Sequence, residues 1–344
     1  MRVFLLAILL ALLTGCGGGT NVTTSAEAKT VYVFAMDTAL TLTAYGDNAE
    51  DALARAEARI TQLDQQFPPT LETSDVHTIN HGNGIPVQVG KDTLSLLSLA
   101  DNLSAVTGGA LDLTTLPVVE AWGFLDRNYR IPSDETLHQL LELVDYREIQ
   151  LNTSAGTVTV PAGAKLSFGA VGKGYAGDQV LEILRDAGVE SALINLGGNV
   201  QLLGAKPDGA PWKVAIQSPD NPNAVVGVLE VTNCAVITAG SYERYFEDEK
   251  GNRYWHIINP STGKPARSGL LSATVVGPEG AVCDGLSTAL FVLGPEKAIE
   301  LWRSMSGFEF ILVTDTGSVL VSEALADHFT PSSEGTTTII PVSD

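Results

Sequence analysis

The sequence predicts an α+β fold with mixed or antiparallel sheets, flanking helices and two intimately joined lobes. Strand-like and helix-like segments follow one another in irregular blocks, whereas a doubly wound parallel sheet would alternate them regularly. Of the 344 residues, about 310 follow a leader-like N-terminal stretch, which suffices for one large domain or two lobes. No low-complexity linker divides them.

The first half of the chain is predicted to begin with strands and continue with amphipathic helices. Val31–Tyr45 is rich in β-branched residues at alternating positions, which predicts one long strand or a pair. Asn48 suits an N-cap, and apolar residues three and four apart follow it, which predicts the first helix. Two more helices are expected at Asp92–Val106 and, with Ser133 as N-cap, at Thr136–Val144.

Strands dominate the second half. They are expected at Thr157–Val160, Lys165–Phe168, Ala192–Asn195, Trp212–Gln217, Val225–Val231, Ala235–Thr238, Tyr254–Ile258 and Leu271–Val276, with a hairpin at Phe308–Val321. Helices are expected at a segment ending at Gly188, at Val282–Phe291 and at Pro295–Met305. The folded domain is therefore predicted to span residues 31–330, and residues 331–344 are expected to form a frayed tail.

The N-terminal residues have the pattern of a targeting sequence. In residues 1–15, Arg2 precedes an apolar run that is too short to span a bilayer and is typical of a signal peptide. Leu13-Thr14-Gly15-Cys16 is similar to a bacterial lipobox, which predicts a lipid on Cys16; an ordinary secretory signal is the alternative. Residues 16–30 are rich in Gly, Ser and Thr and are expected to form a flexible tether. These features predict an exported protein anchored to a membrane by its lipid, on the periplasmic face in a Gram-negative cell.

The net charge and the cysteine content of the chain exclude several kinds of partner and site. The net charge of −20 argues against nucleic acid and anionic lipid, because both require clustered cations. Cys234 and Cys283 would be permitted a disulfide after export, but we expect them to be unpaired. No Cys/His spacing fits zinc, and no GxSxG elbow occurs.

The glycine-dense stretch Leu166–Asp178 is the clearest chemical signal. It places Lys173 among glycines that match GxGxxG, where backbone N–H groups and a helix N-terminus favour an anion. A P-loop is excluded because Gly174 stands where Ser or Thr would bind the metal. A Rossmann site is disfavoured because no acidic residue ends the next strand. A turn that merely needs glycines is the alternative.

Two further segments carry candidate polar groups. Asp112 lies amid apolar neighbours in Thr107–Phe124, and a buried carboxylate needs donors or a cation. His256 lies on a predicted strand before a tight turn, with Tyr242 and Arg244 near it in sequence. Packing roles are the alternative for both residues.

A fourth segment, Cys283–Ala289, opens a predicted helix. Asp284 and Thr288 are four residues apart, so their oxygens lie on one face of that helix. A carboxylate with a hydroxyl is the hard-oxygen ligation that suits Mg²⁺. A helix-end charge and a packed threonine are the alternative.

Taken together, the segments resemble the ApbE family of FAD:protein FMN transferases over nearly all of the chain from Val33 to Gly294. The family's Met-Gly-Thr corresponds to Met36-Asp37-Thr38. Its remaining blocks correspond in order to Gly108–Thr114 with Trp122-Gly123-Phe124, Ser167–Asp178, Thr238–Arg244, His256–Gly263 and Val282–Ala289. Six blocks in the family's order make the resemblance specific.

The resemblance implies Mg²⁺ and a bound FAD that serves as substrate. A threonine hydroxyl of a target protein would attack the FMN-side phosphorus, AMP would leave, and FMN would remain as a phosphoester. Asp284 and Thr288 would ligate the metal with the carbonyl of Ala170, Asp284 would also be catalytic, and His256 would be the base. The residues that would line the flavin nucleotide are Met36, Phe67, Ala110, Leu111, Asp112, Ser167, Lys173 and Ile258.

Three positions depart from the family pattern. Asp37 replaces a glycine, Ser167 replaces an acidic residue that faces the nucleotide in relatives, and Asn259 replaces an aspartate in a turn. The acceptors implied are proteins with a flavinylation-motif threonine, such as subunits of Na⁺-translocating NADH:quinone reductase or Rnf complexes. FAD hydrolysis to FMN and AMP, or flavin binding without turnover, are the alternative functions.

Overall fold

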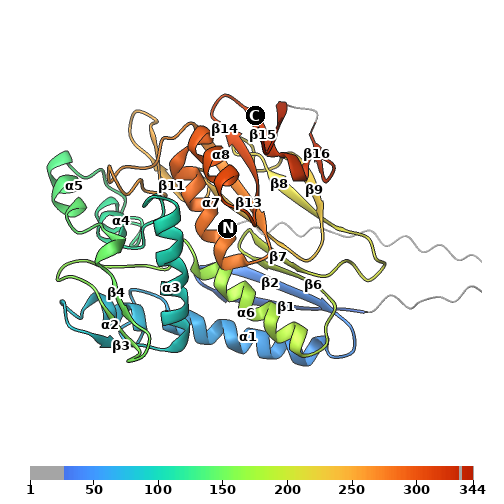
Figure 1. Cartoon of the computed structure of the whole chain (residues 1–344), viewed down its shortest axis with the longest axis horizontal. Helices are drawn as coiled ribbons and strands as arrows, with labels where there is room; N and C mark the ends of the chain where they lie inside the picture. Colours follow the sequence, from blue (N-terminus) through green and yellow to red (C-terminus); the bar gives the residue numbers. More distant parts are fainter. Residues whose placement is uncertain (1–26, 333–334, 344) are drawn as a thin grey trace, which may run out of the picture.

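The computed structural model describes residues 27–332 and 335–343 and builds them around a nine-stranded sheet (Figure 1). Its strand order is β1-β2-β6-β7-β10-β13-β14-β15-β17, and every pair is antiparallel except β15 with β17. The strands are β1 (Ala28–Ala35), β2 (Thr38–Tyr45), β6 (Ser191–Leu196), β7 (Asn199–Leu203), β10 (Ala235–Gly240), β13 (Leu270–Gly277), β14 (Glu309–Thr314), β15 (Ser318–Ser322) and β17 (Thr336–Ile340). This mostly antiparallel sheet with helices confirms the predicted α+β class.

Helices cover one face of this sheet and enclose the main core. They are α1 (Ala49–Gln66), α6 (Gly172–Asp186), α7 (Gly280–Leu293) and α8 (Pro295–Ser304). The central helix is α7, which packs on β10, β13 and α6 and is buried along most of its length. Its near-continuous apolar composition is typical of a helix that is covered on all sides.

The other face carries a three-stranded sheet, β8 (Trp212–Gln217), β9 (Val225–Val231) and β16 (Phe329–Pro331). Residues at alternate positions of β8 are buried, namely Trp212, Val214 and Ile216. They form a second core with Val236 and Val276 of the large sheet. Two sheets stacked face to face thus hold the later strands of the large sheet in place.

A smaller, helix-rich part lies beside the sheet body (Figure 1). It contains α2 (Asp75–Asn80), α3 (Lys91–Val106), α4 (Leu116–Trp122), α5 (Asp134–Leu141), the 3₁₀ turn η1 (Tyr146–Glu148) and the small sheet β3 (Val87–Gln88), β4 (Gln150–Asn152) and β5 (Thr157–Thr159). A third hydrophobic cluster joins this part to the segment after the hairpin β11 (Tyr245–Glu247) and β12 (Arg253–Trp255). Trp122 is central to it and donates from Nε1 to the carbonyl of Gly263.

Several predicted elements are corrected by the structure. Lys165–Phe168 forms only a bridge at Lys165, because the N–H of Ser167 donates to the Leu113 carbonyl instead of joining a strand ladder. Asn48 stands at the N-cap of α1, but its Nδ2 donates to the carbonyl of Ala187. His256 follows β12 rather than lying within it.

The expected boundaries also move at both ends. Strand β1 begins at Ala28, before the predicted boundary at residue 31. The predicted frayed tail is wrong, because Thr336–Ile340 pairs in parallel with β15 and extends the large sheet. Its run of β-branched residues is the local reason for a strand.

The N-terminal predictions stay untested. The signal peptide at 1–15, Cys16 and most of the tether lie outside the described residues. Within the part of the chain that the structure describes, no helix is both long and apolar enough to cross a membrane. Cys234 and Cys283 are both free cysteines.

The β1–β2 hairpin turns through Met36 and Asp37, which have φ angles of 52° and 63°. Two positive-φ residues between paired Ala35 and Thr38 form a tight hairpin turn of the type that favours glycine. Asp37 therefore occupies a position where a glycine would be less strained. The turn is held by the N–H of Met36, which donates to Asp64 Oδ1 at 2.7 Å.

Candidate functional site

Two buried helix N-termini meet at the centre of the molecule, those of α6 and α7. The first N–H groups of a helix have no partner within it. In α6, the N–H of Gly174 donates to Asp284 Oδ2 of α7 at 2.9 Å. In return, the N–H groups of Gly280 and Ala281 in α7 donate to the two carboxylate oxygens of Asp178 in α6, at 2.6 and 2.8 Å. Each helix thus caps the other with a carboxylate, an arrangement that the helix dipoles favour.

Glycines permit the close approach of the two helices. A Cβ on Gly174 would overlap the carbonyl oxygen of Gly280, and one on Gly177 would overlap the carboxamide of Gln201. Gln201 is fully buried on β7 and donates from Nε2 to the Gly174 carbonyl at 2.7 Å. Gly174 is therefore required by the packing of the two helices, which is the alternative that the sequence left open for this turn, and Gly177 leaves room for the Gln201 carboxamide.

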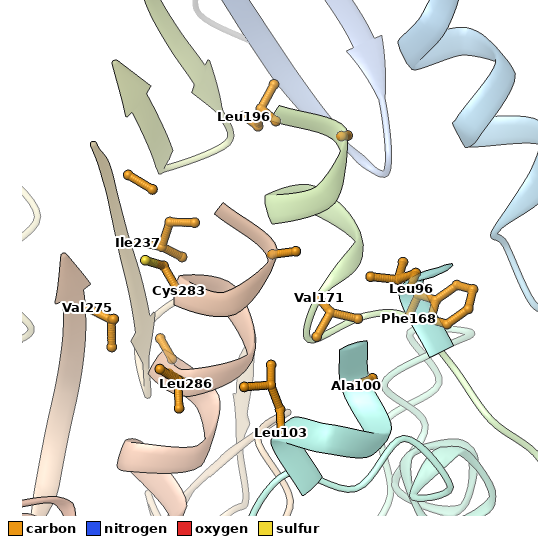
Figure 2. Close-up of a cluster of buried hydrophobic side chains, with 14 of the residues drawn as sticks. Leu96, Ala100, Leu103, Phe168, Val171, Leu196, Ile237, Val275, Cys283 and Leu286 are labelled. Atoms are coloured by element: carbon orange, nitrogen blue, oxygen red, sulfur yellow. The ribbon is translucent and has the colours of Figure 1, made fainter. Parts of the chain in front are cut away.

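The same core fixes α7 against the sheet. Cys283 and Leu286 point toward Ile237 and Val275 of the strands, while Val171, at the entry to α6, packs on the other side (Figure 2). Gly285 leaves room there for α3, because a Cβ at that position would lie 2.7 Å from Leu103 Cδ1. The face of α7 that carries Asp284 is consequently held toward α6.

Asp284 is buried, and burial raises the pKa of its carboxyl group above the ordinary value. The charge of Lys173 opposes this rise most strongly, followed by the N–H of Gly174, the carboxamide of Asn199 and the N–H of Lys173. Although Asn199 influences Asp284, its buried Nδ2 makes no hydrogen bond of regular geometry. Because the pKa stays raised despite these donors, the buried carboxylate is incompletely compensated, and a bound cation would stabilise its charged form.

The donor set around Asp284 fits Mg²⁺. Thr288 lies one helical turn further on α7 and is partly buried. Because Gly174 donates to Asp284, its N–H does not bond the Ala170 carbonyl four residues earlier, and that carbonyl lacks this donor. One carboxylate, one hydroxyl and one carbonyl are hard oxygen ligands, and Mg²⁺ uses few protein ligands. No group of three His, Cys, Asp or Glu suited to a metal occurs within the described residues.

His256 faces the same region from the segment after β12. Its partly exposed ring lies edge-on to Phe124, and Nδ1 lies 3.3 Å from the carbonyl of Arg244. A carbonyl only accepts, so Nδ1 carries the proton and Nε2 keeps its lone pair. Burial, with the positive charges of Arg244 and Lys173, lowers the pKa of His256 to about 4. The imidazole is therefore neutral at pH 7 and able to accept a proton.

Lys173 links these groups. Its charge acts on Asp284, on His256 and on Glu243, a residue beside Arg244 that the sequence did not single out. The structure thus brings together the glycine turn, the 238–263 segment and α7, as the resemblance implied.

The flavin-lining candidates fall into two groups. Phe67, at the end of α1, packs on Phe168 with ring centroids 5.0 Å apart, next to the start of α6. Leu111 is buried beside Gly285 of α7, and Ala110 is the buried residue before it. Ile258 forms the second group, because it lies in the third hydrophobic cluster with Trp122 and Phe124 rather than in the main core.

Asp112 and Ser167 are engaged within the protein. Asp112 Oδ1 accepts from the N–H and hydroxyl of Thr114 at 2.8 and 2.6 Å, and Oδ2 accepts from the N–H of Tyr146 at 3.0 Å. Burial still raises the pKa of the Asp112 carboxyl group. Ser167 Oγ accepts from the N–H of Gly169 at 3.1 Å, so it shapes the turn. The donors that a buried Asp112 requires are supplied by its neighbours.

Asp178, Asn199 and Gln201 were missed by the sequence analysis. Asn199 and Gln201 are two residues apart on β7, so both face the helices. Two amides at alternate positions of an otherwise apolar strand are a signal that could have been found. Asp178 ends the glycine block, but its partners lie more than a hundred residues away.

Alanine substitutions at two glycines of the motif should show whether close packing or backbone flexibility determines their effect on stability. Gly174→Ala should destabilise the protein by about 2 kcal/mol or more, because its Cβ would meet backbone of α7. The matched control is Gly172→Ala, whose Cβ would lie 3.5 Å from Phe168 Cβ in ordinary contact. Urea unfolding measures both variants, and equal stabilities would contradict the packing role.

The cap at α7 should make stability depend on pH. Burial raises the pKa of Asp178 from 3.8 to about 6. The folded state therefore keeps this proton up to a higher pH than the unfolded state does. The contribution of the protonated Asp178 to the free energy of unfolding is complete below pH 3.8 and is lost as the pH rises to about 6.

Asp178→Asn does not titrate, so the wild type should lose stability relative to it over that window. Urea unfolding without divalent cations, from about pH 4 to about pH 7, measures the difference. Other carboxyl groups titrate in both proteins and cancel. A difference that stays constant across the window would show that Asp178 keeps an ordinary pKa.

Comparisons with known proteins agree with this geometry. The ApbE family model matches residues 36–312. The FAD:protein FMN transferase of Haemophilus influenzae is 31% identical over 288 residues, covering 81% of this chain and 83% of the relative. That of Treponema pallidum is 30% identical and covers 95% of this chain and 94% of the relative.

Solved structures give the same result. The ApbE protein of Thermotoga maritima superposes with a TM-score of 0.81 at 30% identity, covering 87% of this chain and 98% of that one. The flavinyl transferase ApbE of Pseudomonas stutzeri superposes with a TM-score of 0.74 at 30% identity, covering 83% and 92%. By sequence and by fold, the chain belongs to the ApbE family.

Proposed function

We propose that this chain is a Mg²⁺-dependent FAD:protein FMN transferase. It cleaves FAD, attaches FMN through a phosphoester to a threonine of an acceptor protein and releases AMP. The observation that carries the proposal is the junction of α6 and α7, where Asp284, two helix N-termini and Lys173 lie together beside a neutral His256. Family membership supports the same reaction.

The junction suits phosphoryl transfer, which needs positioning and charge neutralisation more than covalent chemistry. Lys173 and the N-terminus of α6 offer positive potential to the FAD pyrophosphate. Asp284, Thr288 and the Ala170 carbonyl would hold Mg²⁺, which when bound neutralises charge on the phosphates. Of the apolar residues that would line the flavin nucleotide, Met36 is partly buried, and Phe67, Ala110 and Leu111 belong to the main core behind the site's surface.

His256 accepts the proton of the acceptor hydroxyl at Nε2. The threonine oxygen then forms a bond to the FMN-side phosphorus, and the bond from that phosphorus to the bridging oxygen breaks. The electron pair leaves with AMP, so atoms and charge balance. With a pKa near 4, His256 is in the accepting form over the neutral range.

The setting of the reaction follows from the N-terminal sequence. A lipid on Cys16 would hold the domain outside the cytoplasm at a membrane, on the periplasmic face in a Gram-negative cell. Suitable acceptors there are membrane-associated redox proteins, of which subunits of Na⁺-translocating NADH:quinone reductase and Rnf complexes are the expected examples. The net charge of −20 supports a partner other than nucleic acid.

The deciding experiment incubates the purified protein with FAD, Mg²⁺ and an acceptor that carries an Asp-Xaa-Xaa-Xaa-Xaa-Thr segment. Fluorescent FMN on the acceptor, with one AMP released for each FMN attached, supports transfer. Free FMN and AMP with an unmodified acceptor would replace transfer by hydrolysis, and unchanged FAD would exclude both enzymatic functions.

Removal of the Asp284 charge should abolish turnover. Asp284→Asn keeps the size of the side chain and one acceptor for the Gly174 N–H, but it removes the metal-binding charge. We expect kcat to fall by about a thousandfold, and Mg²⁺ binding measured by calorimetry to disappear. Far-UV circular dichroism checks the fold, and Mg²⁺ affinity equal to that of the wild type would refute the metal role.

Replacement of His256 should affect chemistry more than binding. His256→Gln should lower kcat by about a hundredfold or more, because the proton acceptor is lost, while FAD affinity measured by fluorescence changes little. In the wild type, the acid limb of the kcat profile should fall near pH 4 rather than near the ordinary histidine value of 6.5. Equal losses in kcat and FAD affinity would make His256 a binding residue instead.

A further inference from the structure

Strand β1 is one outer edge of the nine-stranded sheet, so one side of its backbone pairs with no other described strand. The pair Ala35 and Thr38 flanks the two-residue turn and is hydrogen-bonded, and hydrogen-bonded pairs alternate along the ladder. The N–H and C=O groups of Thr30, Tyr32 and Phe34 therefore point away from β2. The hydroxyl contact of Thr30 with Thr43, at 3.0 Å, is the close approach typical of a non-hydrogen-bonded pair.

The side chains of these outward residues are also exposed. Tyr32 and Phe34 are 77% and 79% exposed, while the alternating Val31 and Val33 pack against the main core. The second sheet does not cover them: its contacts with the large sheet begin at Tyr45 of the neighbouring strand β2 and continue to later strands, such as β10 with Val236, and they include no residue of β1. Proteins normally protect such edges from pairing with another strand by proline, bulges or charged side chains. Strand β1 has no proline and no bulge, and Lys29 is its one charged residue.

The edge leads directly to the candidate site. Strand β1 ends in the Met36-Asp37 turn, and Asp37 lines a surface pocket of about 240 Å³ together with Phe124, Glu243 and Arg244. Phe124 and Arg244 are the residues that contact His256. An extended chain lying along β1 towards Asp37 would therefore approach the residues that contact the proposed base.

We propose that the β1 edge binds an extended segment of the acceptor protein as an added strand. Main-chain hydrogen bonds to Thr30, Tyr32 and Phe34 would supply affinity, and the two aromatic rings would select apolar side chains at alternate positions of the segment. The proposal rests on the proposed function, which requires a protein hydroxyl to reach His256. A second copy is the poorer occupant, because each copy carries a net charge of −20.

Two variants test the two parts of this surface. Tyr32→Thr combined with Phe34→Thr removes the rings but keeps strand propensity. Tyr32→Pro removes an outward N–H and leaves the β1–β2 ladder intact. Ile339→Thr is the matched control, because Ile339 is an exposed apolar residue on β17, the opposite edge of the same sheet.

The readouts are FMN transfer to the Asp-Xaa-Xaa-Xaa-Xaa-Thr acceptor, FAD affinity and thermal unfolding. We expect kcat/KM for the acceptor to fall about tenfold or more in both β1 variants, with FAD affinity unchanged and Ile339→Thr equal to the wild type. Hydrogen exchange should also show protection of the Tyr32 and Phe34 amides when the acceptor is added.

Each contrary result has a distinct meaning. Wild-type transfer with undiminished rates in both variants and no amide protection would overturn the docking surface and leave the proposed function intact. No transfer by the wild type would overturn the function itself. Dimer dissociation in the variants, measured by light scattering, with unchanged transfer would assign the edge to a second copy and overturn the proposal.

Discussion

The reciprocal capping of α6 and α7 is the constraint on which the site depends. Asp284 of α7 accepts from the N-terminus of α6, and Asp178 of α6 accepts from the N-terminus of α7. Burial raises the pKa of both carboxyl groups, so the arrangement costs free energy that the N–H donors partly offset. The two helices cannot separate without exposing these donors, and together they therefore hold Asp284 beside Lys173.

The large sheet gives this junction its rigidity. Helix α7 lies on β10 and β13, and the amide of Gln201 from β7 is wedged between the two helix ends. The second sheet packs behind the same central strands and reaches Tyr45 of β2, whereas β1 contributes no residue to that core. The α6–α7 junction, which positions the charged groups, is thus supported by sheet on one side, whereas the edge strand β1 is left unpaired by the described strands.

Some local predictions were incomplete, and one was wrong. The glycine block was predicted to serve an anion, and the structure adds a packing reason, because a Cβ on Gly174 would meet the backbone of α7 and one on Gly177 the Gln201 carboxamide. Asp112 was flagged because it is acidic among apolar residues, and its donors prove to be Thr114 and Tyr146. The expected tail is a strand, because Thr336–Ile340 finds an available edge at β15. In each case the deciding partner is distant in sequence or belongs to a turn that composition does not specify.

The sequence by itself determined the α+β class, the positions of most helices and strands, and the pairing of Asp284 with Thr288 on one helix face. These features depend on periodicity and on residues within one or two turns of each other. Only the tertiary structure decided that Asp178 caps α7, that Gln201 lies between two helices and that Lys173 acts on both His256 and Asp284. The contact from Gly174 to Asp284 spans 110 residues, and such contacts arise from the packing of whole elements, which no local pattern encodes.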